Sequence, residues 1–163
     1  MKNEKGFSLI ELLIVVAIIG IIAAIAIPNL LKSRQAANEA SAIGSVRTVG
    51  TAQATYQSTM GKGKDFAASL ATLKTDGGVD NSLGSGLKSG FNFSSVGVAS
   101  TSTGTPSYFD TLADPQSTGA FGTGNRHFYS NESFVIYQDP AAAIAKFTFP
   151  RNTTDPAAHT PIE

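Results

Sequence analysis

The chain has no cysteine, which excludes disulfides, thiolate metal sites, iron–sulfur clusters and cysteine nucleophiles. It has no tryptophan and only two histidines, His127 and His159, so it offers few groups for acid–base catalysis. Charged residues make up 15% of the 163 residues, below the usual share of about a quarter. Because 12 basic residues balance 12 acidic ones, the chain lacks the basic excess typical of nucleic-acid-binding proteins.

Familiar motifs of catalysis are also missing from the sequence. It contains no G-x-S-x-G, H-E-x-x-H, P-loop or G-x-G-x-x-G pattern. The glycine-rich segment 119–124 has the wrong spacing for a dinucleotide loop and is interpreted as a flexible turn. Segment 76–81 has oxygen-bearing side chains that suit calcium but lacks the EF-hand spacing, so calcium binding stays a minor alternative. We therefore expect no catalytic residues, no cofactor and no metal.

One apolar run dominates the N-terminal region. Residues 7–27 (FSLIELLIVVAIIGIIAAIAI) contain a single charged residue, Glu11. As a helix the run spans about 30 Å, the thickness of the hydrocarbon core of a bilayer. Because apolar residues cover every face, the pattern predicts a transmembrane helix rather than an amphipathic one. Lys2 and Lys5 precede the run, and the positive-inside rule then places the N-terminus in the cytoplasm.

Glu11 is the unusual residue of this run. A carboxylate within a membrane helix costs about 2.5–3.5 kcal/mol on insertion scales, and less near a helix end. Its side chain could reach back to the membrane surface, since it lies only one turn into the helix. Alternatively it has a positively charged partner, which Lys2 and Lys5 supply only if they remain attached.

Residues 5–11 (KGFSLIE) and the apolar run after them resemble the class III signal of type IV prepilins and type II secretion pseudopilins. That signal is a short basic leader ending in glycine, then phenylalanine, with glutamate four residues later, and the likeness continues through residues 23–29 (AAIAIPN). The resemblance implies that a prepilin peptidase cuts between Gly6 and Phe7 and that the new Phe7 amine is N-methylated. It also implies that this amine pairs with Glu11 of a neighbouring subunit during filament growth. Within one chain the pair is possible as well, because positions i and i+4 share a helix face.

An ordinary signal peptide is the competing interpretation of the same region. Residues 24–26 (AIA) look like a leader-peptidase site. However, the apolar run exceeds the usual length of about 7–15 residues, it contains Glu11, and Pro28 follows just after that site. We therefore expect the mature protein to keep this helix.

The helix is predicted to continue over residues 29–60, which contain no proline. Pro28 removes a backbone hydrogen bond and Gly20 is a weak point, so we expect a kink or a melted turn between residues 20 and 28. Gly61 and the residues up to Lys64 should end the helix. Residues spaced by three or four predict one stripe that packs on a small domain: Ile43, Val46, Val49 or Gly50, Gln53, Tyr56 and Met60.

Beyond this helix the pattern predicts a short helix over 66–73 capped by Asp65, with Leu70 and Leu73 inward, and then a loop over 74–90. His127 is expected to face solvent or a neighbouring group. Consecutive strands separated by turn residues favour an antiparallel meander. The expected strands are 91–98, 108–113, 126–129, 134–137 and 144–149.

The sequence thus predicts an α+β, pilin-like fold. We expect a leader over 1–6, a transmembrane and filament-core helix over 7–28, its amphipathic continuation over 29–60, a globular domain with an antiparallel sheet over 61–149, and an irregular tail over 150–163. The family resemblance implies a structural subunit of a type IV pilus, not an enzyme. A pseudopilin of a type II secretion system and a membrane-anchored monomeric binding protein remain alternatives.

The resemblance also implies the partners and the location of the chain. The partners are other copies of the chain, the bacterial inner membrane before assembly, a prepilin peptidase, and the pilus or secretion machinery. We expect no nucleic-acid binding. The precursor would reside in the inner membrane, and the assembled subunit would form part of an extracellular filament.

Overall fold

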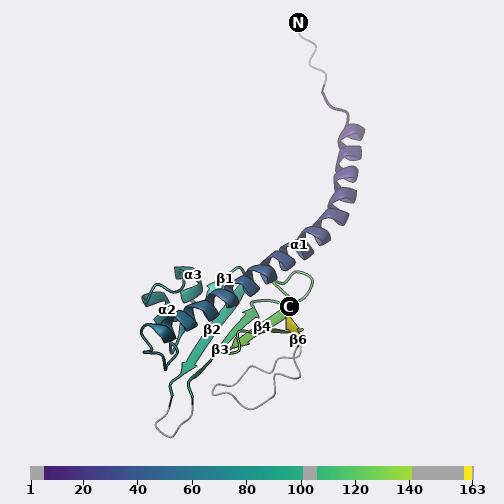
Figure 1. Ribbon diagram of the computed structural model, residues 1–163. Coiled ribbons are helices and arrows are strands. Elements are labelled where there is room, and N and C mark those ends of the chain that lie inside the picture. Colours follow the sequence, from purple (N-terminus) through teal and green to yellow (C-terminus); the bar gives the residue numbers. More distant parts are fainter. Residues whose placement is uncertain (1–5, 101–105, 141–159, 163) are drawn as a thin grey trace.

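A computed structural model describes residues 6–100, 106–140 and 160–162. A long helix, α1 (Leu9–Ser58), runs from an isolated N-terminal end to a sheet that packs along its second half (Figure 1). Two short helices, α2 (Leu70–Thr75) and α3 (Asn81–Gly84), lie at the far end of that half. The predicted α+β, pilin-like fold is therefore confirmed. The described strands are β1 (Leu87–Lys88), β2 (Phe91–Val98), β3 (Tyr108–Pro115), β4 (Arg126–Asn131), β5 (Ile136–Pro140) and β6 (Thr160–Ile162).

Helix α1 is continuous over 50 residues, with Pro28 inside it. Of the two alternatives expected between residues 20 and 28, the melted turn is wrong, because both Gly20 and Pro28 lie in helical backbone. The kink at Gly20 and Pro28 stays a prediction. One proline removes one donor, and the bonds of the neighbouring turns are enough to keep the helix intact. Figure 1 shows that the helix curves between its free end and the sheet rather than breaking.

The helix ends at Ser58, close to the expected position. The amides of Gly61 and Gly63 donate to the carbonyls of Tyr56 and Gln57, each over 2.8 Å, so the last carbonyls of the helix find partners. Gly63 has a positive φ of 74°, which suits glycine at a helix end.

The predicted stripe is confirmed at its centre, where Val46, Val49, Gly50 and Gln53 are buried. Ile43 and Tyr56 are partly buried against the same core. Met60 follows the end of the helix and is 63% exposed, so it does not extend the stripe.

The strands form one antiparallel sheet in sequence order, β1-β2-β3-β4-β5-β6, which confirms the predicted meander. Strand 91–98 has the expected bounds, whereas β3 and β4 continue two residues further than expected. Strand β5 begins at Ile136 rather than Phe134, because Phe134 closes a turn in which its amide donates to the Asn131 carbonyl over 2.9 Å. The Phe134 ring lies over Gly50, where an added Cβ would be only 3.3 Å away.

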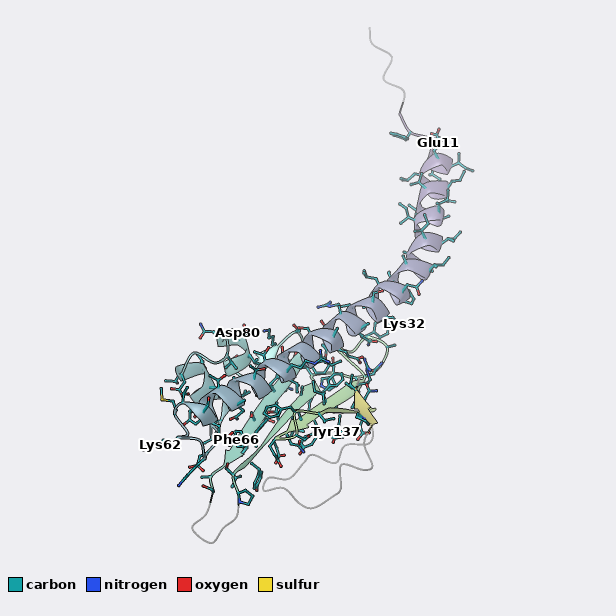
Figure 2. All side chains as sticks on the ribbon, viewed as in Figure 1. Glu11, Lys32, Lys62, Phe66, Asp80 and Tyr137 are labelled. Carbon is teal, nitrogen blue, oxygen red and sulfur yellow. The ribbon has the colours of Figure 1, made fainter. Side chains whose placement is uncertain are left out.

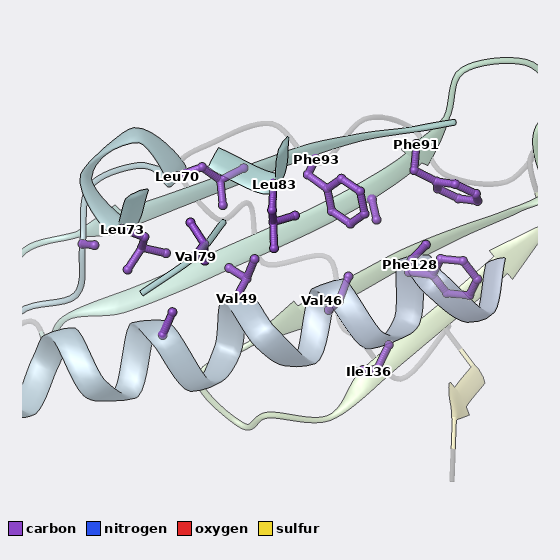
Figure 3. Packing of buried hydrophobic residues seen from close by; sticks show 14 residues of the cluster. Val46, Val49, Leu70, Leu73, Val79, Leu83, Phe91, Phe93, Phe128 and Ile136 are labelled. Carbon is purple, nitrogen blue, oxygen red and sulfur yellow. The ribbon is translucent and has the colours of Figure 1, made fainter. Parts of the chain in front are cut away.

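The core lies between α1, the two short helices and one face of the sheet (Figure 3). Phe91 and Phe128 are fully buried on neighbouring parts of the sheet, with ring centroids 5.9 Å apart. Leu70 and Leu73 are buried as predicted. Alternate residues of the strands thus provide the large apolar side chains that the stripe on α1 covers.

The short helix after α1 differs from the prediction in its start and in its capping residue. The helix expected over 66–73 begins at Leu70 and is capped by Ser69, whose hydroxyl accepts from the Thr72 amide over 3.2 Å. Asp65 instead accepts from the amide and hydroxyl of Ser100, 35 residues away, at 2.8 and 2.9 Å. Asp65 therefore stabilises a contact with a distant loop and does not cap the short helix.

The segment 74–90, expected to be a loop, contains α3 and β1. The tail 150–163, expected to be irregular, contributes β6 beside β5, with Ile162 opposite Ile136. Pro161 is tolerated there because β6 is an outer strand of the sheet in the described residues. The strand expected over 144–149 and the residue His159 lie outside the described residues.

Candidate assembly surface on the N-terminal helix

The segment before α1 holds the two residues predicted for cleavage. Gly6 and Phe7 lie outside the helix, and Phe7 is 94% exposed. A Cβ added to Gly6 would meet no atom within 4 Å. The peptide bond between these residues is therefore open to an approaching protein.

Glu11 lies in the first turn of α1, and its Oε2 atom accepts a hydrogen bond from the Ser8 amide over 2.8 Å. Ser8 is the N-cap residue of the helix. An acidic side chain at this place satisfies an amide that has no partner within the helix and also interacts favourably with the helix dipole. Glu11 thus has a local role that the sequence interpretation missed. The spacing Ser8-x-x-Glu11 is the signal that could have revealed it.

The free part of α1 presents apolar side chains around its whole circumference (Figure 2). The large apolar residues from Leu9 to Ile27 are each between 51% and 80% exposed. In water, exposure of each such side chain would cost about 1.5–3 kcal/mol relative to burial. By length and composition, α1 is able to cross a membrane. We call this surface, residues 7–27, the apolar helix segment.

Away from the N-terminal helix, the ion pair between Asp80 and Lys88 has a local structural role. The Asp80 carboxylate caps α3 by accepting from the Leu83 amide and also pairs with Lys88, each over 2.7 Å. The Leu83 amide and then the Lys88 ammonium hold the pKa of Asp80 below its ordinary value. Both oxygens of this carboxylate therefore have protein partners. The described residues contain no group of three or more His, Asp or Glu side chains that could hold a metal ion.

His127 contacts a neighbouring strand, since its Nδ1 atom lies 2.5 Å from Asp114 Oδ1.

The glycine-rich segment 119–124, interpreted as a flexible turn, is instead hydrogen-bonded to α1. The Gln35 amide donates to the carbonyls of Gly119 and Gly122 over 2.6 and 3.1 Å. The sequence contained no local signal for the contacts of Gln35, because its two partners lie 84 and 87 residues away along the chain.

The fold and the apolar helix segment together define a pilin-like architecture, with an apolar helical spine and an antiparallel sheet domain. Comparison with known proteins agrees with this architecture. Residues 1–27 match the family described as the prokaryotic N-terminal methylation motif. This match confirms the resemblance that the sequence predicted for the N-terminal region.

The curated relatives are named as type IV pilus proteins or as fimbrial proteins. The chain is 67% identical over 39 residues to the type IV wide pilus major component of Thermus thermophilus, covering 24% of this chain and 30% of the relative. It is 48% identical over 65 residues to the type IV major pilin protein of Myxococcus xanthus, covering 40% and 30%. It is 43% identical over 75 residues to a fimbrial protein of Pseudomonas aeruginosa, covering 46% and 47%.

These alignments span less than half the length of the curated relatives. No solved structure matches the chain significantly. The similarity to type IV pilins is therefore carried by a part of the chain.

Proposed function

We propose that this chain is a structural subunit of a type IV pilus. It is made as a prepilin, cleaved after Gly6, N-methylated on Phe7 and polymerised through its N-terminal helix. The observation that carries the proposal is the apolar helix segment, which exposes its large side chains on every face and contains one charged residue, Glu11. The names of the relatives, which are major pilins and fimbrial proteins, support it.

The exposed apolar surface suits a subunit that moves from a bilayer into a bundle of identical helices. Both environments exclude water, so the transfer of the apolar side chains is close to neutral in free energy. A single polar pair is then able to decide how neighbouring helices align, as buried polar residues do in coiled coils.

Cleavage after Gly6 would provide the partner for that pair. The Phe7 nitrogen is a peptide amide in the precursor and becomes a positive amine after cleavage, and a methyl group on it preserves the charge. The Glu11 carboxylate already points toward the N-terminal end of α1, where it accepts from the Ser8 amide. It is thus well placed to bind an amine from its own chain or from a neighbouring subunit.

The remaining parts of the proposal concern location and partners. The leader, residues 1–6, would stay in the cytoplasm while the apolar helix segment spans the inner membrane. A prepilin peptidase would act on Gly6-Phe7, and assembly machinery would supply the energy for extraction. The assembled product is an extracellular polymer of this chain.

Deletion of the gene tests this function directly. We expect surface filaments, seen by electron microscopy, to disappear and to return when the gene is supplied on a plasmid. The purified filaments should contain this chain. A defect in protein secretion with filaments retained would contradict the pilus proposal and favour the pseudopilin alternative.

A further inference from the structure

A groove lies beside α1 where the helix leaves the sheet. It has a volume of about 560 Å³ and is bordered by the loop 116–125, which joins β3 to β4. Lys32, labelled in Figure 2, marks this position on the helix. The apolar lining comes mainly from Ala23, Ala24, Ile27, Pro28, Leu31 and Phe121.

Three polar side chains of α1 fix the loop that forms one wall of the groove. The Gln35 amide holds two loop carbonyls, as described above, and the Asn38 amide donates to the Thr123 carbonyl over 3.0 Å. The Glu39 carboxylate accepts from the Asn125 amide over 2.7 Å. Gln35, Asn38 and Glu39 lie at positions i, i+3 and i+4, so they share one face of the helix.

Glu39 also connects the loop to the sheet. Its Oε2 atom accepts from Arg126 Nε over 2.8 Å, and Arg126 is the first residue of β4. Glu39 is buried, and charge-assisted bonds of this kind are stronger than neutral ones. Glu39 therefore fixes the end of the loop to both α1 and the first residue of β4.

Hydrogen bonds inside the loop hold its shape. The Thr123 amide donates to the Ser117 carbonyl over 2.8 Å, and the Gly119 amide donates to Asn125 Oδ1 over 3.0 Å. Phe121 nevertheless remains 83% exposed. A large aromatic side chain on a fixed loop can bind a partner without the entropy cost of ordering the loop, which is typical of binding hot spots.

We propose that this groove receives the apolar helix segment of a second copy of the chain, with Phe121 packed against it. This inference rests on the proposed function and adds a contact between the sheet domain of one subunit and the helix of another. The loop 116–125 contains no Asp, Glu, Lys or Arg, and the charged residue of the lining, Lys32, lies on the helix. The loop side of the groove therefore suits an uncharged occupant. The apolar helix segment has the matching chemistry.

The geometry of α1 requires that the helix come from another copy. Residues 9–58 form one continuous helix, so the apolar helix segment cannot fold back into the groove beside its own second half. Ala23, Ala24 and Ile27 belong both to the groove and to the apolar helix segment. A helix that packs along the segment therefore continues into the groove, and the small alanines permit close approach.

A membrane surface is the competing occupant. Loops that lie at a membrane surface typically carry Trp, Tyr, Lys or Arg, and residues 116–125 carry none of these. The composition of the loop thus favours a protein helix over lipid head groups.

Photo-cross-linking in filaments tests the inference. Phe121 is replaced by p-benzoylphenylalanine, and sheared filaments are irradiated and analysed by mass spectrometry. We expect species of twice the subunit mass, with the cross-link on residues 9–27 of the second copy. The matched control carries the same group at Met60, which is exposed just after the C-terminal end of α1, and should not label those residues. Filaments whose residue 121 labels other segments, or lipid alone, would overturn the inference and leave the proposed function intact.

The absence of native cysteine allows a second measurement. In the variant Phe121→Cys, a water-soluble maleimide should label the single thiol at least tenfold more slowly in filaments than in the membrane-bound subunit. Equal labelling rates would overturn the inference, as would a thiol already protected in the membrane before assembly. If the wild-type chain formed no filaments, the proposed function would fail first, and this inference with it.

Discussion

The two halves of α1 face different surroundings although they form one helix. Its second half buries one stripe, including Val46 and Val49, against the sheet and leaves its other face exposed. Its first half exposes large apolar side chains on every face and carries one charge, Glu11. A single stripe is enough where one partner is present, whereas an all-apolar circumference suits lipid or several neighbouring helices.

Polar residues also have different roles in the two halves. In the second half, Gln35, Glu39 and Gln53 connect the helix to loops and strands of the same chain. In the first half, Glu11 is bonded only one turn away, to the Ser8 amide. The second half of α1 therefore holds the fold together, whereas the first half remains free to contact other molecules. Changes in the two halves should therefore have separable effects.

Removal of residues 1–28 should have the largest effect, because it deletes the whole apolar helix segment. We expect the remaining fragment to be soluble and monomeric, with its sheet intact, since the core lies beyond the deleted segment. Sedimentation gives the oligomeric state and circular dichroism the fold. Stable filaments formed by this fragment would contradict the separation of roles.

Glu11→Leu should abolish assembly while cleavage and the sheet domain stay intact. The substitution leaves the Phe7 amine without its proposed partner, and an unpaired buried charge costs about 3–5 kcal/mol. Glu11→Gln keeps an acceptor for the Ser8 amide and should be less severe. The assay compares mature subunit in membranes with sheared filaments for both variants. A normal filament yield from Glu11→Leu would instead indicate that Glu11 merely reaches the membrane surface.

Phe128→Ala should destabilise the sheet domain without a direct effect on the apolar helix segment. Phe128 is fully buried beside Phe91, so its truncation should lower the free energy of unfolding by about 3–5 kcal/mol. Phe121→Ala removes a ring of the same size from the surface and should change stability by less than about 0.5 kcal/mol. Denaturant unfolding of the fragment lacking residues 1–28 gives both values. Equal losses for the two variants would contradict the assigned core.

Asp80→Asn should have the smallest effect, and one that depends on pH. Because the folded state lowers the pKa of Asp80, its charge adds stability above the unfolded pKa of about 3.9, and this contribution disappears as the pH falls through the lower folded pKa. Asparagine remains a good N-cap, so the variant isolates the charge. We expect a difference of a few tenths of a kcal/mol near neutral pH, since the Lys88 pair is largely exposed. Unfolding curves whose difference grew toward acid pH would be inconsistent with this sign.

The sequence predicted those parts of the molecule that rest on local pattern. The apolar run indicated the free half of α1, and alternating Phe91 and Phe93 indicated β2 with its correct bounds. It could not predict contacts between distant residues, such as Asp65 with Ser100 or Gln35 with Gly119. Strand β6 was missed for a related reason, since its pairing with β5 outweighs the presence of Pro161.

At the candidate site, sequence pattern identified the residues but not all of their contacts. Gly6, Phe7 and Glu11 were singled out by the resemblance of residues 5–11 to the class III prepilin signal, and the structure places them at the exposed start of α1. The hydrogen bond from the Ser8 amide to Glu11 could have been predicted, because Ser8-x-x-Glu11 has the spacing of a capping box. The groove beside Phe121 was not, because it forms only when the loop 116–125 packs against α1.

The most direct test of the account is the intact mass of the subunit from sheared filaments, combined with N-terminal sequencing. We expect a mature chain that begins at Phe7 and carries one methyl group on its amine. The variant Gly6→Val should retain the leader, remain in the membrane and yield no filaments. A mature chain that begins at Met1, or at Ile27 as after an ordinary signal peptide, would contradict the account.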